Sequence, residues 1–456
     1  MSRISEEQLG TENITHLMIR MSIPSIVAQT INILYSIIDR IYIGHIEGIG
    51  TNALTGVGLT LPIITLISAF SAFVGAGGAP LAAIFLGKGD KKRAEEILGS
   101  GIFLLSVFTV ILMAVFYVFK VPLLYAFGAS DQTLPYADRY LSIYLMGTLM
   151  VELALGLNPF IISQGQARIG MLTVLIGAVA NLILDPVFIF GFHMDVRGAA
   201  IATVISQTIS AIWILAFLSG KKTTIRIRRK YIRPDLRNIK STCSLGISPF
   251  IMRSTESLIS IVMNRGLQIY GGDLYVGSLT ILQSIMQFLY APIAGFTQGV
   301  QPIISYNYGA GKFDRVKKTY RGMIGTVCLY AFVTTGIVML FPAFFAGFFA
   351  DDRELIALVA KVAPLFMCGG LIFGIQQGVQ PTFLATGQAK LSLFLAMLRK
   401  VILLVPLAMI LPRFMGIWGV YASEPISDIV SAVTAGILFA TQMKKVLSKE
   451  ALAKIR

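Results

Sequence analysis

Twelve long apolar stretches follow one another along the chain, and they limit its fold more than any other feature. A helix needs about 20 such residues to cross the ~30 Å hydrocarbon core of a bilayer. Only 13% of the residues are charged, against roughly 25% in soluble domains, and the mean hydropathy is +0.76. The sequence therefore predicts an all-α integral membrane protein. The twelve predicted helices lie at residues 17–43, 53–79, 97–119, 138–160, 169–191, 198–218, 242–269, 275–304, 320–343, 356–384, 390–411 and 417–441.

Lysine and arginine are concentrated in alternate connections between these stretches. The basic connections include residues 87–96, 163–168, 220–240 and 309–318 and the C-terminal tail, and the intervening ones are short and neutral or acidic. Cytoplasmic loops of membrane proteins carry an excess of basic residues. We therefore expect the basic connections and both termini to lie in the cytoplasm, with the protein in the inner (plasma) membrane. The same asymmetry accounts for the net charge of +15, so no nucleic-acid partner is expected.

The chain also repeats itself, and one constant offset in residue number relates the two copies. The repeated pairs are Pro80 and Pro302, Gly87 and Gly309, Gly89 and Gly311, Arg93 and Arg315, Pro159 and Pro381, and Gly165 and Gly387. Each repeat holds six helices, and an even number makes both copies enter the membrane from the same side. The pattern predicts two parallel six-helix lobes around a central cleft. The expected parts are a cytoplasmic segment 1–16, a first lobe 17–218, a basic linker 219–240, a second lobe 241–441 and a cytoplasmic tail 442–456.

Two acids inside the apolar stretches of the first lobe most need explaining. Asp39 and Asp185 lie five and six residues inside the outer ends of their helices, and Thr203 lies at a similar depth, about 8 Å below the boundary. Tyr35 and Asn181 each precede an acid by four residues and so share its helix face. An acid at the centre of a membrane helix costs about 2.5–3.5 kcal/mol. The set predicts one polar chamber for a small cation or a proton, Na⁺ being the only metal ion expected.

Local roles for the two acids stay open as an alternative. Arg40 follows Asp39 and can reach the membrane surface as its partner. Pro186 follows Asp185 and frees a backbone carbonyl one turn upstream, so this step can serve as a kink.

The second lobe carries a different polar set. At nearly the same offset that relates the repeats, Asn264 and Glu424 correspond to Asp39 and Thr203. Glu256 lies three residues after Arg253 in the seventh helix, and Arg399 and Lys400 lie inside the eleventh. These residues are expected either to form a structural ion pair or to line a substrate cavity. The lobes thus share a fold and differ in chemistry.

The segments that carry these residues resemble the multidrug and toxic compound extrusion (MATE) family of antiporters. The matching patterns are IPSIVAQTINILYSIIDRIYIG at 23–44, GKGDKKRAEE at 87–96, QGQAR at 164–168, NLILDPVFIFGF at 181–192 and GAAIAT at 198–203. The helix-5 pattern is similar to the bacterial branch of multidrug exporters. The resemblance implies export of amphipathic organic cations in exchange for inward Na⁺ or H⁺, by alternating access. It also implies a cation site at Asp39, Asn181, Asp185 and Thr203 with Tyr35 beside them, and a second-lobe role for Glu256.

Two other functions are weighed against export of cations. A lipid-linked saccharide flippase of the same superfamily would favour a cationic cavity and more helices. A membrane enzyme would need a constellation such as DxD, HExxH or GxSxG, and the chain contains none. The three cysteines form no CxxC motif, so neither zinc nor a cofactor is expected besides the coupling ion. The expected partners are small organic cations and lipid, and the protein is expected to be a monomer and not an enzyme.

Overall fold

The computed structural model describes residues 6–350 and 352–455. Within these ranges every regular element is a helix. The first half contains α1 (Glu6–Thr11), α2 (Ile14–Gly44), α3 (Gly50–Gly87), α4 (Lys91–Ala126), α5 (Leu134–Met146), α6 (Thr148–Ser163), α7 (Ala167–Pro186), the π-helix η1 (Val187–Gly191) and α8 (Asp195–Ser219).

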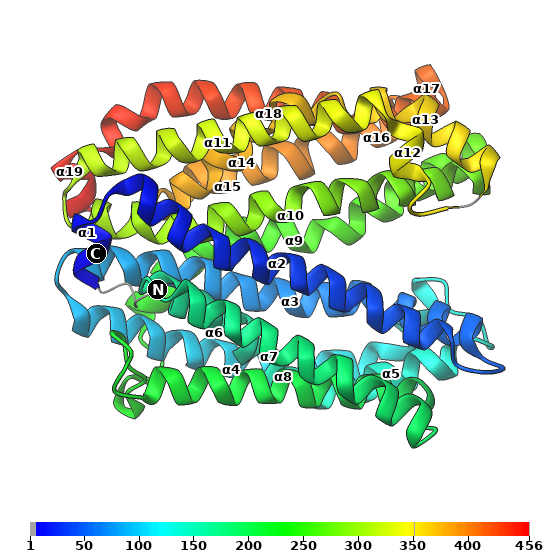
Figure 1. Ribbon diagram of the computed structural model, residues 1–456, viewed down its shortest axis with the longest axis horizontal. Helices are drawn as coiled ribbons and strands as arrows, with labels where there is room; N and C mark the ends of the chain where they lie inside the picture. The colour runs from blue at the N-terminus through cyan, green and yellow to red at the C-terminus, as the bar shows by residue number, and fades with distance from the viewer. Residues whose placement is uncertain (1–5, 351, 456) are drawn as a thin grey trace. The chain divides into compact units, whose positions relative to one another are not determined.

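The second half repeats this order after a short 3₁₀ turn. It contains η2 (Arg229–Tyr231), α9 (Leu236–Gly271), α10 (Asp273–Gly309), α11 (Phe313–Leu340), α12 (Pro342–Ala346), α13 (Arg353–Met367), α14 (Gly370–Ala385), α15 (Ala389–Met397), the π-helix η3 (Leu398–Leu404), α16 (Val405–Ile410), α17 (Pro412–Met415), α18 (Ile417–Val446) and α19 (Lys449–Ala453). Each predicted apolar stretch coincides with one long helix or with shorter helices in series (Figure 1).

Length and hydropathy identify the membrane-spanning helices. In the described residues nine helices pass such a test, and two bent pairs, α5 with α6 and α13 with α14, raise the number to as many as eleven. The α9 helix has 36 residues, which is long enough to span, but it carries several charged residues. The predicted all-α membrane fold is thus confirmed.

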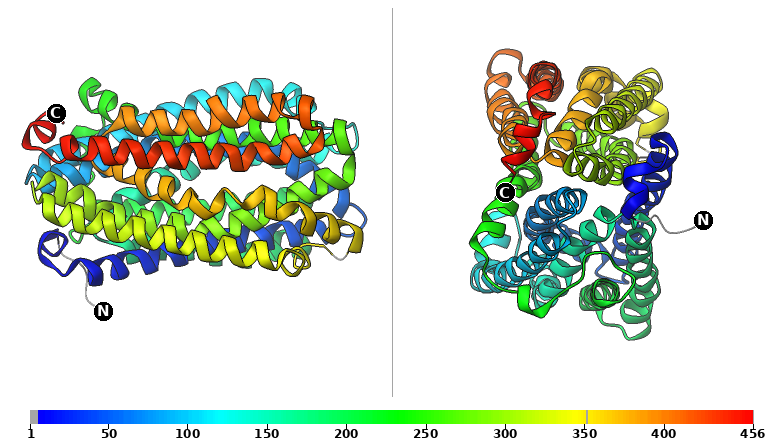
Figure 2. Two further views of the ribbon diagram at one scale, coloured as in Figure 1. Left: turned by 90° about the horizontal axis from the view of Figure 1, so that it is seen from above. Right: turned by 90° about the vertical axis from the view of Figure 1, so that its left-hand side faces the viewer.

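The chain forms two compact units, each of which holds one repeat. Unit 1 contains Val27–Arg253, and unit 2 contains Leu9–Ile26 and Ser254 onward. Within each unit the long helices run alongside one another, as the view along their axes shows (Figure 2). The predicted residue bounds of the lobes stay a prediction.

The repeated glycines close the same turn in both units. Gly89 and Gly311 have φ of +78° and +68°, and Gly165 and Gly387 have φ of +84° and +72°. Only glycine adopts this left-handed conformation without a steric cost. The repeated glycines therefore mark helix ends that have to turn sharply into the next helix.

The basic linker is fixed to unit 1 by two side chains. The Gln164 side-chain oxygen accepts hydrogen bonds from the Thr223 hydroxyl at 2.7 Å and from the backbone N–H groups of Thr224 and Ile225 at 2.8 and 2.9 Å. At the start of α4, Glu95 accepts from the Arg226 backbone N–H at 3.2 Å and the Arg228 guanidinium at 3.3 Å. The linker is therefore an ordered part of unit 1.

Candidate functional site

A change of helix type sets the position of Asp185 in unit 1. Pro186 ends α7 because it has no N–H to continue the hydrogen-bond ladder, and η1 continues as a π-helix. Single π-turns of this kind are frequent at functional sites. Asp185 is 1% exposed, and one turn before it the Asn181 amide donates to Asp185 Oδ1 at 3.1 Å.

Asp39 brings a second carboxyl to the same place from α2. The Asp39 and Asp185 side chains lie close enough to interact, and Tyr35, one turn before Asp39, interacts with both. Asp39 Oδ1 and Asp185 Oδ2 are both buried without a hydrogen-bond partner. The structure therefore brings together Asp39, Asp185, Asn181 and Tyr35, and leaves one oxygen on each acid free to take a ligand.

Thr203 joins this set through a tyrosine. It lies on α8, 8% exposed, in side-chain hydrogen-bond contact with Tyr140 of α5, and Tyr140 also interacts with Asp39. The ring of Tyr140 stacks on Tyr144 one turn later, with centroids 6.4 Å apart and an interplanar angle of 15°. Thr203 is thus linked to Asp39 through Tyr140. We call the five predicted residues, Asp39, Asp185, Asn181, Tyr35 and Thr203, the Asp39–Asp185 chamber.

The local alternative for the two acids explains only part of this geometry. Arg40 acts electrostatically on Asp39 but points to the surface and is exposed, and it leaves Asp39 Oδ1 unbonded. A buried carboxylate oxygen without a partner is unfavourable unless it holds a proton or a cation. Two such oxygens, an amide and hydroxyls form the hard-oxygen set that a small cation prefers.

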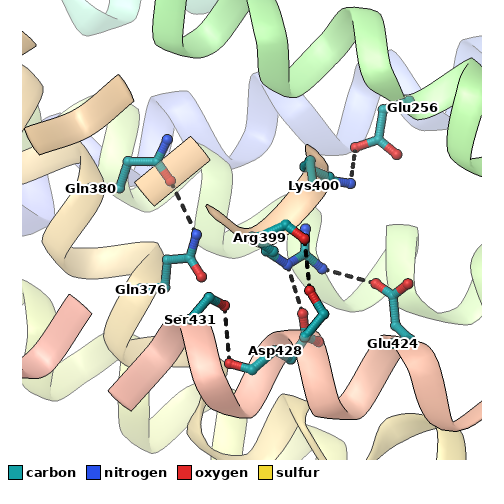
Figure 3. A network of polar contacts seen from close by, with 9 residues as sticks. Glu256, Gln376, Gln380, Arg399, Lys400, Glu424, Asp428 and Ser431 are labelled. Atoms are coloured by element: carbon teal, nitrogen blue, oxygen red, sulfur yellow. Dashed lines mark hydrogen bonds and ion pairs between the residues drawn. The ribbon is translucent and has the colours of Figure 1, made fainter. Parts of the chain in front are cut away.

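Unit 2 contains a polar network of paired charges (Figure 3). Arg399, in η3, donates from Nε to Asp428 Oδ1 at 2.6 Å and from its terminal guanidinium nitrogen to Glu424 Oε1 at 2.9 Å. Next to it, Lys400 donates to Glu256 Oε1 at 2.8 Å. The Arg399 guanidinium also lies 4.3 Å from the centroid of the Phe373 ring. We call these five charged residues the Arg399 network.

The network joins three of the four second-lobe residues predicted from sequence. Arg399, Glu424 and Glu256 belong to it, and Asn264 lies half-buried on α9 and forms none of its bonds. Arg399 and Lys400 are 5% and 4% exposed, whereas the Glu256 side chain is 55% exposed. The network is thus buried at Arg399 and exposed at Glu256.

Sequence reasoning missed four residues of these sites. Tyr140 and Tyr144 carry no sequence signal except their spacing of one turn, because tyrosine is common in membrane helices. Asp428 lies one turn after Glu424 and interrupts the same apolar stretch. Glu152, in the middle of a predicted helix, is 0% exposed. The last two show the signal that identified Asp39 and Asp185, an acid inside an apolar run.

Comparison with known proteins places the fold and the family. The multidrug export protein MepA of Staphylococcus haemolyticus (strain JCSC1435) is 27% identical over 456 residues, which cover 99% of this chain and 100% of that protein. MepA of Staphylococcus aureus (strain MSSA476) is 26% identical over 427 residues, 92% of each chain.

Solved structures agree with this placement. A MOP superfamily transporter from Pyrococcus furiosus Vc1 (DSM3638) superposes with a TM-score of 0.90 at 21% identity, over 98% of this chain and 100% of that one. A MATE crystal structure in the bent conformation gives a TM-score of 0.90 at 22% identity, over 99% and 100%. At such identities the likeness shows the fold alone.

The family model MatE matches residues 24–187 and 250–410. The two matched ranges cover more than half of the chain and fall one in each repeat. The resemblance inferred from the sequence is thereby confirmed, as is the expectation of a transporter and not an enzyme. The chain belongs to the MatE family of multi-pass membrane transporters.

Proposed function

We propose that this protein exports amphipathic organic cations in exchange for inward Na⁺ or H⁺. The observation that carries the proposal is the Asp39–Asp185 chamber, in which each of two interacting carboxyls keeps one buried oxygen without a partner. The names of the MepA relatives, multidrug export proteins, support multidrug export as the task. The protein acts as a monomer in the plasma membrane, with both termini in the cytoplasm.

Ion binding and cargo release are coupled through the charge of the chamber. When the chamber faces outward, it takes up Na⁺ or a proton, and its negative charge falls. The segment of α2 that carries Tyr35 and Asp39 then repacks, the affinity for the organic cation drops and the cargo leaves. The loaded transporter turns inward and releases the ion. Such coupling requires that ion and cargo bind the two states with different affinities.

The chamber suits either coupling ion. Among the described residues, no three His, Cys, Asp or Glu side chains group in a way that would hold a metal ion. A Na⁺ ion would therefore be held by two carboxyls together with the neutral oxygens of Asn181, Thr203 and Tyr35, and a proton would be shared by the carboxyls. Net inward movement of positive charge gains ~2.3 kcal/mol per charge per 100 mV of membrane potential.

Transport in proteoliposomes tests the proposal. The purified protein is reconstituted, a Na⁺ gradient and a pH gradient are imposed separately, and the movement of ethidium is followed. We expect the gradient of the coupling ion to drive ethidium transport in the wild type, and the double variant Asp39→Asn with Asp185→Asn to lose it. Asp131→Asn is the control, because this acid lies on the loop before α5, where it accepts a hydrogen bond from Tyr125.

Two results would contradict the proposal. One is gradient-driven ethidium transport in the double variant at the wild-type rate. The other is a wild-type protein that moves ethidium equally with and without both gradients.

A further inference from the structure

Glu152 is a buried acid that the proposed mechanism does not use. It lies on α6, is 0% exposed, and neither of its carboxyl oxygens has a hydrogen-bond partner. Its polar neighbours are the Ser71 hydroxyl of α3, also buried and unbonded, and Tyr144 of α5. A carboxylate without a counter-charge at such a place would be strongly unfavourable, so the group is held as the neutral acid.

The helices pack closely one turn beyond Glu152. One turn beyond the Ser71–Glu152 pair, a Cβ on Gly75 would lie 2.8 Å from the Gly156 carbonyl oxygen, so α3 and α6 are in backbone contact there. On its other side, a Cβ on Gly156 would lie 2.8 Å from the Leu105 side chain of α4. Close packing beside a fully buried acid favours a proton over a larger cation.

The helices packed against α6 supply no counter-ion. In α5, Asp138 is paired with Lys120 at 2.7 Å, and Arg139 lies 4.0 Å from Asp195. The α3 helix has no charged residue in its entire length. On α8 the only charged residues are Asp195 and Arg197, at its start. The charged residues of α4 and α7 also lie near their ends, and Asp185, near the end of α7, is bonded to Asn181 in the chamber. The groups that face Glu152 are thus Ser71 and the titratable Tyr144.

Tyr144 connects Glu152 with the Asp39–Asp185 chamber. It interacts electrostatically with Glu152 and with Tyr35, and Tyr35 interacts in the same way with Asp39 and Asp185. Tyr144 and Glu152 lie on opposite sides of the 62° bend between α5 and α6. The two tyrosines are therefore titratable groups within electrostatic range of both Glu152 and the chamber.

We propose that Glu152 is a second proton-binding site of unit 1, which exchanges its proton with the Asp39–Asp185 chamber through Tyr144 and Tyr35. In that step the O–H bond of Glu152 breaks and an O–H bond forms on an aspartate. Each tyrosine accepts one proton and gives one up, and the net charge of unit 1 stays constant. Proton binding by Glu152 does not depend on export. The exchange of this proton with the chamber rests on the proposed function.

Infrared difference spectroscopy tests whether Glu152 holds a proton. Full-length protein in nanodiscs is compared between neutral and strongly alkaline buffer, and the carbonyl band of protonated carboxyl groups is measured. On the Asp39→Asn, Asp185→Asn background we expect this band to persist. Adding Glu152→Gln, which is neutral and nearly isosteric, should lower the intensity of this band by the contribution of one carboxyl group. An unchanged band after that substitution would overturn the proposal.

Transport tests whether the proton moves. With a pH gradient imposed, we expect Glu152→Gln to lower ethidium transport at least tenfold and Glu152→Asp, which keeps a titratable group, to restore part of it. Glu96→Gln is the control, since this acid pairs with Arg93 at 3.7 Å near the start of α4. Size-exclusion elution and ethidium binding verify the fold of each variant.

The outcomes separate this inference from the proposed function. Wild-type transport by Glu152→Gln, with its infrared band lost, means a fixed structural proton and overturns the exchange. Wild-type transport by the Asp39→Asn, Asp185→Asn protein overturns the proposed function and leaves the infrared result for Glu152 intact.

Discussion

Buried acids occur in both units, but their surroundings differ residue by residue. Asp39, Asp185 and Glu152 in unit 1 each keep oxygens without a hydrogen-bond partner. In unit 2, Asp428 and Glu424 are bonded to Arg399, and Glu256 is bonded to Lys400. An acid with a fixed basic partner has little to gain from an external cation. The free acids of unit 1 are therefore the ones suited to bind and release an ion.

Removal of Arg399 should destabilise the protein strongly. Arg399→Met leaves Asp428 and Glu424 buried without their counter-charge, and breaking a buried ion pair from one side costs about 3–5 kcal/mol. Thermal unfolding in detergent measures the loss. Lys390→Met on α15 is the control because Lys390 is exposed. Equal thermal midpoints for the two variants would show that the Arg399 network contributes no net stability.

The chamber residues could be predicted from the sequence because acids are rare in apolar stretches. Asp39, Asp185 and Asn181 stand out by their charge or polarity, and helix geometry gives their depth and shared faces. Tyr140 could not be found this way, because its contacts with Thr203 and Asp39 depend on how α5 packs against α2 and α8. Glu152 is also an acid inside an apolar stretch. It is not grouped with Asp39, Asp185 and Thr203 because it lies much further from the outer end of its helix.

At the scale of elements, the fifth helix of each repeat contains a π-helical segment. In unit 1, η1 directly follows Asp185, and in unit 2, η3 itself carries Arg399 and Lys400. A π-turn widens the helix and changes the direction of its side chains relative to an α-helix. Hydropathy predicted both helices as continuous spans, because a π-turn changes no residue's polarity.

Replacement of Pro186 at the end of α7 should impair export without loss of stability. Pro186→Ala restores a backbone N–H that can bond to the Leu182 carbonyl, and an interior proline costs a helix about 3 kcal/mol or more. We expect an unchanged or higher thermal midpoint together with slower gradient-driven ethidium transport, because Asp185 turns away from Asp39. Pro62→Ala in α3 is the control, and equal transport by both variants would argue against a role for Pro186.

The repeated turn glycines should be intolerant of any side chain. Gly165→Ala and Gly387→Ala force alanine into a left-handed conformation that costs about 1–2 kcal/mol each. Gly58→Ala is the matched control, since Gly58 is helical and has open space around its Cβ position, and alanine there should stabilise the helix by up to about 1 kcal/mol. Opposite shifts of the thermal midpoint are expected, and a common sign would contradict this account.

Some features of the helices could not be predicted from the sequence. The α4 helix extends from Lys91 to Ala126, beyond the predicted stretch 97–119, because hydropathy detects only the part that lies in hydrocarbon. The bends of 62° and 50° that divide the fourth and tenth spans fall within continuous apolar sequence. They depend on packing, for example of Gly147 against the Val204 side chain.

At the scale of the whole molecule, the two units share a backbone fold but carry different polar residues. Both units close the same glycine turns, bend the fourth helix and place a π-segment in the fifth. The constant offset between the repeated prolines and glycines predicted this duplication. It could not predict the Arg399 network, because Arg399 and Asp428 have no charged counterpart at that offset in the first repeat.

Neutralising acids should therefore affect stability differently in the two units. Asp39→Asn with Asp185→Asn removes two acids that lack fixed counter-ions and should change the free energy of unfolding by about 1 kcal/mol or less. Glu424→Gln with Asp428→Asn leaves Arg399 buried as an uncompensated cation and should cost about 3–5 kcal/mol. Thermal unfolding of both double variants at one pH measures the difference. A larger loss in the unit 1 variant would contradict this assignment of roles.

The attachment of the linker to Gln164 and Glu95 has a consequence for proteolysis. The segment is rich in lysine and arginine, yet Thr223, Ile225 and Arg226 are bonded to unit 1 and cannot extend into a protease cleft. Lys221 and Lys222, which are exposed just before this attachment, remain accessible. Trypsin should cut native protein at exposed basic residues of the segment such as Lys221 and Lys222 and spare Arg226. Cleavage at Arg226 would show that the segment detaches from unit 1 during transport.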